Sequence, residues 1–163
     1  MNPYAVHLEG RDASLVIAET PTHLGQVVRS LDAKALNTSP APGKWSIRQI
    51  LTHLADCELV FGFRLRQTVA QPHHTVQPFD QDQWAAQYDA YDALTALETF
   101  TTMRRWNILF LSSLPRESFA KQMTHPERGT MTLQVVVETM AGHDRNHVKQ
   151  IVRIAGGVGS AGR

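Results

Sequence analysis

The amino-acid sequence predicts an all-α protein, a four-helix bundle with long connections between the helices. Apolar residues recur at helical spacing in four long segments of the chain. Loops rich in Pro, Gly and Ser separate these segments, and no strand–helix alternation indicates a parallel sheet. Four amphipathic helices bury their apolar faces most simply against one another, which favours a bundle.

Capping residues in the sequence predict where the first two long helices begin. Thr20 followed by Pro21 is typical of an N-cap and a first helical position. Ser46 and Gln49 have the spacing of a capping box, which predicts a helix from about 47 to about 70.

The second half of the chain is expected to hold two more long helices. We expect a short helix at 82–88, a long helix at about 93–114, a turn-rich loop at 124–131, and a last helix from about 132 to about 155 that ends at the Gly156–Gly157 pair.

Length and composition limit the class of protein. The 163 residues predict a single domain, 1–163, with a core at about 12–155 and a flexible tail at 156–163. The 16 Lys and Arg nearly balance the 15 Asp and Glu, so neither nucleic acid nor an anionic membrane surface is an expected partner. Cys57 is the only cysteine, and no apolar run is long enough for a signal peptide or a membrane span, so a cytoplasmic protein is expected.

The stretch GHDRNHVKQI places His143 and His147 four residues apart within an apolar helical pattern. At about 100° per residue, both imidazoles lie on one face, one turn apart, as in H-x-x-x-H metal sites. Buried imidazoles are costly unless their nitrogens are paired, so the pair either fills a core or binds a divalent metal.

A catalytic metal of the zinc type needs a third protein ligand and one open position. His53, on the apolar face of the second long helix, is the candidate. Cys57, four residues later, is either an additional ligand or a buried structural thiol.

Three polar residues are candidates for contacts behind the ligands or for a catalytic role. Asp56 and Gln150 each follow a candidate ligand by three residues. Asp144 follows His143 directly and so points about 100° away, which also allows it to face a neighbouring helix. No general acid or base stands out.

Three segments together resemble the DinB superfamily and its YfiT-like branch of metal-dependent enzymes. They are PGKWSIRQILTHLADCELVFGFRLR (42–66), HPERGTMTL (125–133) and AGHDRNHVKQI (141–151), and the similarity extends over roughly 12–154. The resemblance implies a four-helix bundle in which His53, His143 and His147 bind one divalent metal, nickel or zinc, in a protein that forms homodimers in many relatives.

The resemblance also implies a small-molecule substrate and favours the first of three functions, to which the other two are alternatives. The first is activation of a low-molecular-weight thiol, as co-substrate, for S-transfer to an electrophile, because a dipositive metal favours the thiolate. The second is a hydrolase that uses metal-bound hydroxide. The third is a non-catalytic metal-binding stress-response bundle with a closed ligand shell.

Overall fold

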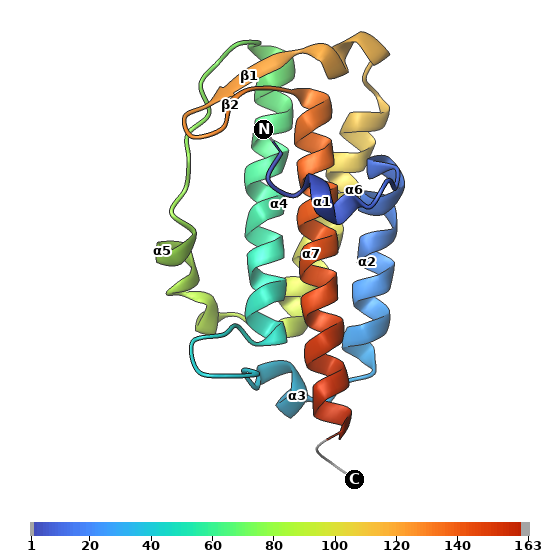
Figure 1. Ribbon diagram of the computed structural model, residues 1–163, viewed down its shortest axis with the longest axis vertical. Helices are drawn as coiled ribbons and strands as arrows, with labels where there is room; N and C mark the ends of the chain where they lie inside the picture. Colours follow the sequence, from blue (N-terminus) through green and yellow to red (C-terminus); the bar gives the residue numbers. More distant parts are fainter. Residues whose placement is uncertain (1, 161–163) are drawn as a thin grey trace.

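The computed structural model describes residues 2–160, and four long helices dominate it (Figure 1). They are α2 (Ala13–Arg29), α4 (Ile47–Ala70), α6 (Ala93–Ser112) and α7 (Leu133–Ser160). The predicted four-helix bundle is confirmed. No helix within residues 2–160 is long and apolar enough to cross a membrane.

Short helices and strands connect or flank the four long helices. They are α1 (Ala5–Leu8), α3 (Ala33–Asn37), α5 (Gln81–Ala85), the 3-10 turns η1 (Tyr88–Ala90) and η2 (Arg116–Ala120), and the strands β1 (Gln122–His125) and β2 (Gly129–Thr132).

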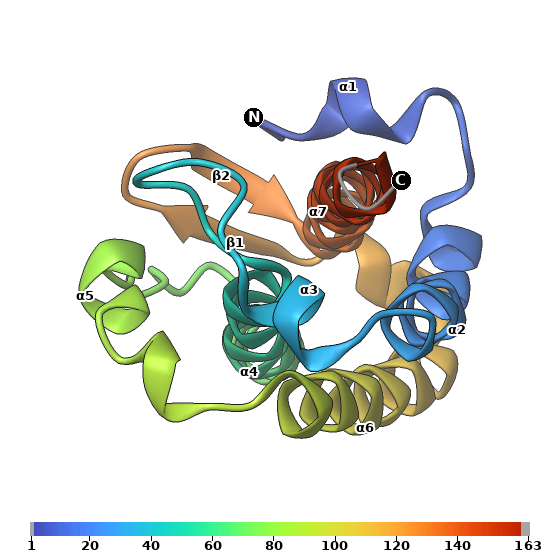
Figure 2. The same ribbon diagram turned by 90° about the horizontal axis from the view of Figure 1, so that it is seen from below.

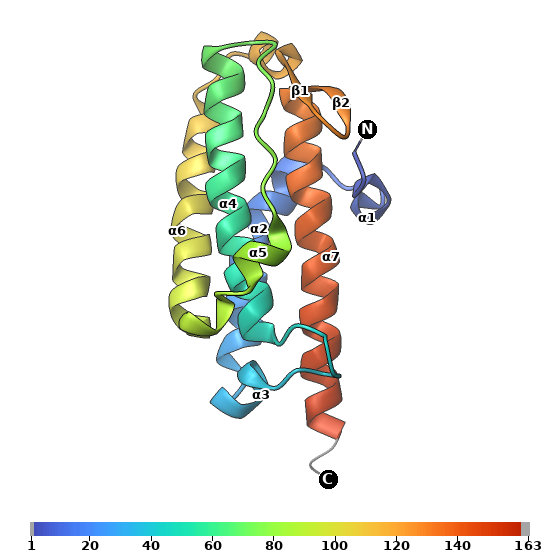
Figure 3. The same ribbon diagram turned by 90° about the vertical axis from the view of Figure 1, so that its left-hand side faces the viewer.

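The long helices form a square when the bundle is seen along its axis (Figure 2). Both α2 and α4 pack against α6 and α7, so α2 and α4 lie across the bundle from each other although they are consecutive long helices. The segment that contains α5 runs beside α4, outside the square (Figure 3). This arrangement brings α4 and α7, the helices with the three candidate histidines, side by side.

The expected start of α4 is confirmed, whereas the expected start of α2 was wrong. Ser46 and Gln49 form the predicted capping box. The helix α2 begins at Ala13, after the N-cap Asp12, so Pro21 lies inside it. A proline inside a helix leaves the carbonyl four residues earlier without its amide donor. Here the guanidinium of Arg104 donates to that carbonyl, the Ile17 oxygen, at 2.9 Å.

Two further expectations need correction. The segment expected as a loop at 124–131 forms an antiparallel hairpin, in which Met123 pairs with Met131 and both side chains are buried. The last helix does not end at Gly156 and Gly157 but continues to Ser160. Glycine costs only about 1 kcal/mol in a helix, so two glycines do not oblige it to stop. The last residues of the predicted tail, 161–163, lie outside the described residues.

The interior consists of two hydrophobic clusters with polar side chains between them. One cluster packs the ends of α4, α6 and α7 around Leu51, Phe100 and Ile154, and the other packs the opposite ends around Leu65 and Met140. The buried polar residues of α4, α6 and α7 lie at the intermediate level, and this level holds the candidate site.

Candidate metal centre

The structure brings the three predicted histidines together, one from α4 and two from α7. The Nε2 atom of His143 lies 2.9 Å from Nε2 of His53 and 3.1 Å from Nε2 of His147. The three side chains, with Cys57, are called the histidine cluster below. The four-residue spacing on α7 and the contact between α7 and α4 therefore place the imidazoles as the sequence predicts.

Burial keeps these imidazoles neutral. His53, His143 and His147 are each at least nine-tenths buried. Burial, followed by the charge of His147, lowers the pKa of His53 to about 3, and burial lowers the pKa of His147 to about 4. Burial also lowers the pKa of His143 well below its usual value, with the neighbouring imidazoles adding to the effect. Near neutral pH each ring therefore keeps a nitrogen lone pair.

Hydrogen bonds at Nδ1 direct two of these lone pairs inward. The Nδ1 of His147 lies 3.0 Å from the side-chain oxygen of Gln150, which can only accept, so Nδ1 carries the proton. The Nδ1 of His53 lies 3.5 Å from the hydroxyl of Tyr88, which in turn hydrogen-bonds the carboxyl of Asp56. These partners leave Nε2 of His53 and of His147 as the atoms with free lone pairs.

The Nε2 atoms cannot all satisfy one another. An N–H on Nε2 of His143 can donate to only one of its two Nε2 neighbours. The other Nε2 neighbour has only the weak S–H donor of Cys57, whose Sγ lies 3.5 Å from Nε2 of His53, unless a cation supplies the interaction. Tetrahedral coordination at about 2.0–2.1 Å from a zinc-like ion separates two ligands by about 3.3 Å, close to the observed spacing. The donor set thus fits a divalent metal, with His53, His143 and His147 as the residues that would hold it.

Cys57 lies at the edge of the cluster. Its Sγ atom is 3.5 Å from Nε2 of His53 and 3.9 Å from Nε2 of His143. His53, Cys57 and His143 form a group whose ligand atoms all lie within 4.8 Å of one another, a group that does not include His147. Burial raises the pKa of the Cys57 thiol, and the carboxyls of its sequence neighbours add to the effect, so the free thiol is protonated. Both readings of Cys57, ligand and buried thiol, are therefore compatible with its position.

Asp144 does not face the imidazoles. It pairs with Arg104 at 2.5 Å, and the same guanidinium pairs with Glu58 at 2.7 Å. Asn107 donates to Glu58 at 3.0 Å. These four residues are called the closed ion cluster below. Asp144 thus takes the alternative position, toward a neighbouring helix, that its 100° offset from His143 allows.

Opposing effects act on Arg104, which is 1% exposed. Burial lowers its pKa, but the carboxylates of Asp144 and Glu58 raise it further, and the net direction is upward. The guanidinium therefore stays charged inside the bundle, held by two carboxylates.

The N-terminal segment covers the α7 side of the histidine cluster. The ring of Tyr4 meets the ring of His143 edge to face, with centroids 5.1 Å apart. A Cβ on Gly142 would lie 2.3 Å from the carbonyl oxygen of Tyr4, so only glycine permits this approach. Arg145 also donates to the carbonyl of His7 at 2.6 Å. Tyr4 and Tyr88 were not predicted, because neither lies near a candidate ligand in the sequence.

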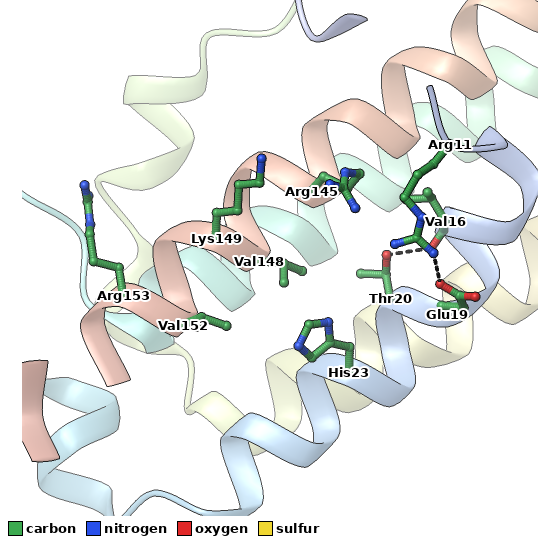
Figure 4. Close-up of a pocket in the computed structure, with 10 residues that line it drawn as sticks. All are labelled: Arg11, Val16, Glu19, Thr20, His23, Arg145, Val148, Lys149, Val152 and Arg153. Carbon is green, nitrogen blue, oxygen red and sulfur yellow. Dashed lines mark hydrogen bonds and ion pairs between the residues drawn. The ribbon is translucent and has the colours of Figure 1, made fainter. Parts of the chain in front are cut away.

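A hollow of about 450 Å³ between α2 and α7 lies apart from the histidine cluster (Figure 4). Val148 and Val152 face His23 across it, and no residue of the histidine cluster lines it. Its charges are largely matched, because Arg11 pairs with Glu19 at 2.6 Å, and Arg145 and Lys149 both pair with Glu9. This groove is not part of the candidate site.

Comparison with known proteins identifies the family. The family model of the DinB superfamily matches residues 17–151. The chain belongs to the DinB superfamily. A relative from Bacillus cereus is 29% identical over 143 residues, which cover 85% of this chain and 80% of the relative. A relative from Bacillus thuringiensis has the same identity and coverage. Both are provisionally named as metal-dependent hydrolases.

Two solved structures share the fold of this DinB-superfamily chain. YfiT from Bacillus subtilis, described as a probable metal-dependent hydrolase with an unusual four-helix bundle topology, is 22% identical. It aligns with a TM-score of 0.83 over 90% of this chain and 86% of YfiT. A mycothiol-dependent maleylpyruvate isomerase is 10% identical and aligns with a TM-score of 0.66 over 86% of this chain and 58% of the isomerase.

Proposed function

We propose that the histidine cluster binds one divalent metal and that the protein is a metal-dependent hydrolase of small molecules. The observation that carries this proposal is the buried cluster of neutral imidazoles in which Nε2 of His143 lies 2.9 Å from Nε2 of His53 and 3.1 Å from Nε2 of His147. The provisional names of the relatives agree with it.

A bound divalent ion supplies Lewis-acid activation, which lowers the pKa of water toward neutrality. The chain supplies orientation. Gln150 fixes the ring of His147, and Tyr88 with Asp56 fixes the ring of His53. Neutral ligands would leave the full charge of a bound ion uncompensated in the buried site, where it would stabilise a developing anion on the substrate.

Thiol S-transfer is the second candidate function. The likeness to the mycothiol-dependent isomerase favours it, because the same fold there serves thiol-dependent chemistry. A cationic centre favours the thiolate over the thiol for the same electrostatic reason that it favours hydroxide over water. The two functions differ in one requirement, since only the second needs an added thiol.

Elemental analysis of untagged protein tests the metal centre, and nickel and zinc are the ions to supply. We expect about one equivalent in the wild type and loss of the metal in His143→Ala. His23→Ala is the matched control, because it removes an exposed histidine of α2 and should retain the metal. A wild-type protein that takes up no metal after reconstitution would exclude both functions.

Activity of the loaded protein then separates the candidates. Turnover of an ester, amide and lactam panel without thiol, lost in His53→Ala, is expected for the hydrolase. Turnover of an electrophile only with bacillithiol, mycothiol or glutathione would replace it with S-transfer. For the third alternative, a closed and non-catalytic site, sulfur-to-cobalt charge transfer that disappears in Cys57→Ser and an absence of turnover are the expected signs.

A further inference from the structure

Arg64 is a buried cation without a counter-ion. It is 7% exposed, yet no carboxylate within residues 2–160 forms an ion pair with it. Its one hydrogen bond of the usual length runs from Nη2 to the backbone oxygen of Gln77, at 3.2 Å. Arg104, the other deeply buried arginine, is held by two carboxylates. A buried charge is costly unless it is paired, so Arg64 is suited to an anion that the chain itself does not provide.

The position of Arg64 relates it to the histidine cluster. Arg64 follows Cys57 by seven residues, close to two turns of α4, so both lie on the same face of the helix.

A second cation acts on Arg64. Arg128 stands in the turn between β1 and β2. Its charge lowers the pKa of Arg64, after the larger effect of burial, so the two cations influence each other.

Arg64 also lines a hollow of about 550 Å³ between α4 and the segment before α5. The other walls are mainly apolar and include the paired rings of Phe79 and Trp84, whose centroids are 4.9 Å apart. Asp80, the acid in this wall, accepts from the backbone amides of Asp82 and Gln83 as the N-cap of α5. An apolar hollow with a single buried cation is complementary to an apolar body that carries one acid group.

We propose that Arg64 and this hollow form the recognition site for a substrate with a carboxylate and a compact apolar body, such as an aryl group. The carboxylate pairs with the Arg64 guanidinium, and the apolar body packs against Phe79 and Trp84. As the recognition site of a substrate, this inference rests on the proposed function of the histidine cluster, to which Arg64 is related by the shared face of α4, since no residue of that cluster lines the hollow itself.

Binding of benzoate to metal-free, ¹⁵N-labelled protein tests the site without any catalysis. Nuclear magnetic resonance reports on the indole N–H groups, which Trp84→Phe and Trp106→Phe assign. We expect a saturable shift at Trp84, inside the hollow, and none at Trp106, on the exposed side of α6. Benzamide, the neutral analogue, should bind at least tenfold more weakly.

Variants of two arginines test whether benzoate binding requires the charge of Arg64. Arg64→Gln should weaken benzoate binding at least tenfold, whereas Arg105→Gln, which removes an exposed guanidinium of α6, should change it less than twofold. Equal binding of benzoate and benzamide, or unchanged benzoate binding in a folded Arg64→Gln, would overturn the proposal. If Arg64→Gln does not fold, the proposal is tested by whether the wild type binds benzoate more tightly than benzamide.

A substrate comparison separates failure of this inference from failure of the proposed function. Loaded protein should hydrolyse aryl esters that carry a carboxylate with a higher kcat/KM than their neutral analogues, and Arg64→Gln should abolish the preference. Benzoate binding without hydrolysis of any ester would leave the site standing and refute the hydrolase. Hydrolysis without a preference for the acidic esters would refute the recognition role alone.

Discussion

The histidine cluster and the closed ion cluster share neighbouring residues of α4 and α7, and α6 adds Arg104 and Asn107 to the second, yet their electrostatics differ. Cys57 and His143 belong to the first, and the next residues, Glu58 and Asp144, belong to the second. One step along a helix turns a side chain by about 100°, which is enough to send neighbours to different places. In the closed ion cluster one cation meets two carboxylates, whereas in the histidine cluster neutral acceptors face one another.

This difference in electrostatics indicates a structural role for the closed ion cluster and a functional role for the histidine cluster. The closed ion cluster matches its own charges and also caps the carbonyl that Pro21 leaves free, although Nε of Arg104 has no hydrogen-bond partner. In the histidine cluster neutral acceptors share few and weak donors, which a cation would replace. Arg64 contrasts with both as a buried cation that has no carboxylate partner within residues 2–160. A group of neutral acceptors and a cation without a counter-ion thus lie along one face of α4.

The largest effect is expected from breaking the closed ion cluster. Arg104→Met removes the cation and leaves the buried carboxyls of Glu58 and Asp144 without a counter-ion, which should lower the free energy of unfolding by about 3–5 kcal/mol. Denaturant unfolding of the metal-free protein measures it, with the exposed Arg105→Met as the control. A change below about 1 kcal/mol would show that this cluster does not hold the bundle together.

Acidification should lower the free energy of unfolding by protonating the unfolded counterparts of the buried histidines. The pKa values of about 3 for His53 and about 4 for His147, and the lowered pKa of His143, lie below the usual 6.5, so the unfolded chain binds more protons than the folded one. The stability linked to the neutral imidazoles is present above pH 6.5 and is lost as the pH falls. The unfolded imidazoles are already half protonated at pH 6.5, so each group loses about 1 kcal/mol between pH 6.5 and 5.5, and three groups lose about 3 kcal/mol.

Denaturant unfolding of metal-free protein across this pH range provides the measurement. His143→Gln should reduce the pH dependence by about a third, because one of the three groups is gone. A stability that stays flat from pH 6.5 to 5.5 would contradict neutral, buried imidazoles.

The smallest effect is expected from Gln150, which hydrogen-bonds the candidate ligand His147. Gln150→Ala removes the acceptor that orients His147, which should weaken metal affinity by about 10- to 100-fold while leaving the fold intact. Competition with a chelator measures the affinity. Gln134→Ala, on an exposed part of α7, is the control, and equal affinities in the two variants would remove Gln150 from the site.

Local signals in the sequence predicted the helices and the shared face of His143 and His147. The capping box at Ser46 and the four-residue histidine spacing act within one or two turns, so they can be read without knowledge of the rest of the fold. The N-cap at Asp12 was equally local, since its side chain accepts from the amide of Leu15, but the Thr20–Pro21 pair was the more conspicuous signal.

Contacts between segments far apart in the sequence determined the surroundings of the histidines and the hairpin. Tyr88 reaches His53 across 35 positions, and Tyr4 reaches His143 from the other end of the chain, so no spacing rule announces either. The hairpin at 122–132 depends on pairing and on burial of its methionines against the bundle. Whether a buried arginine is paired, as Arg104 is, or unpaired, as Arg64 is, also depends on which helices meet. By itself the sequence determined which residues could bind a metal, because helical periodicity is local, whereas the tertiary structure decided what surrounds them, because packing brings together residues that the sequence keeps apart.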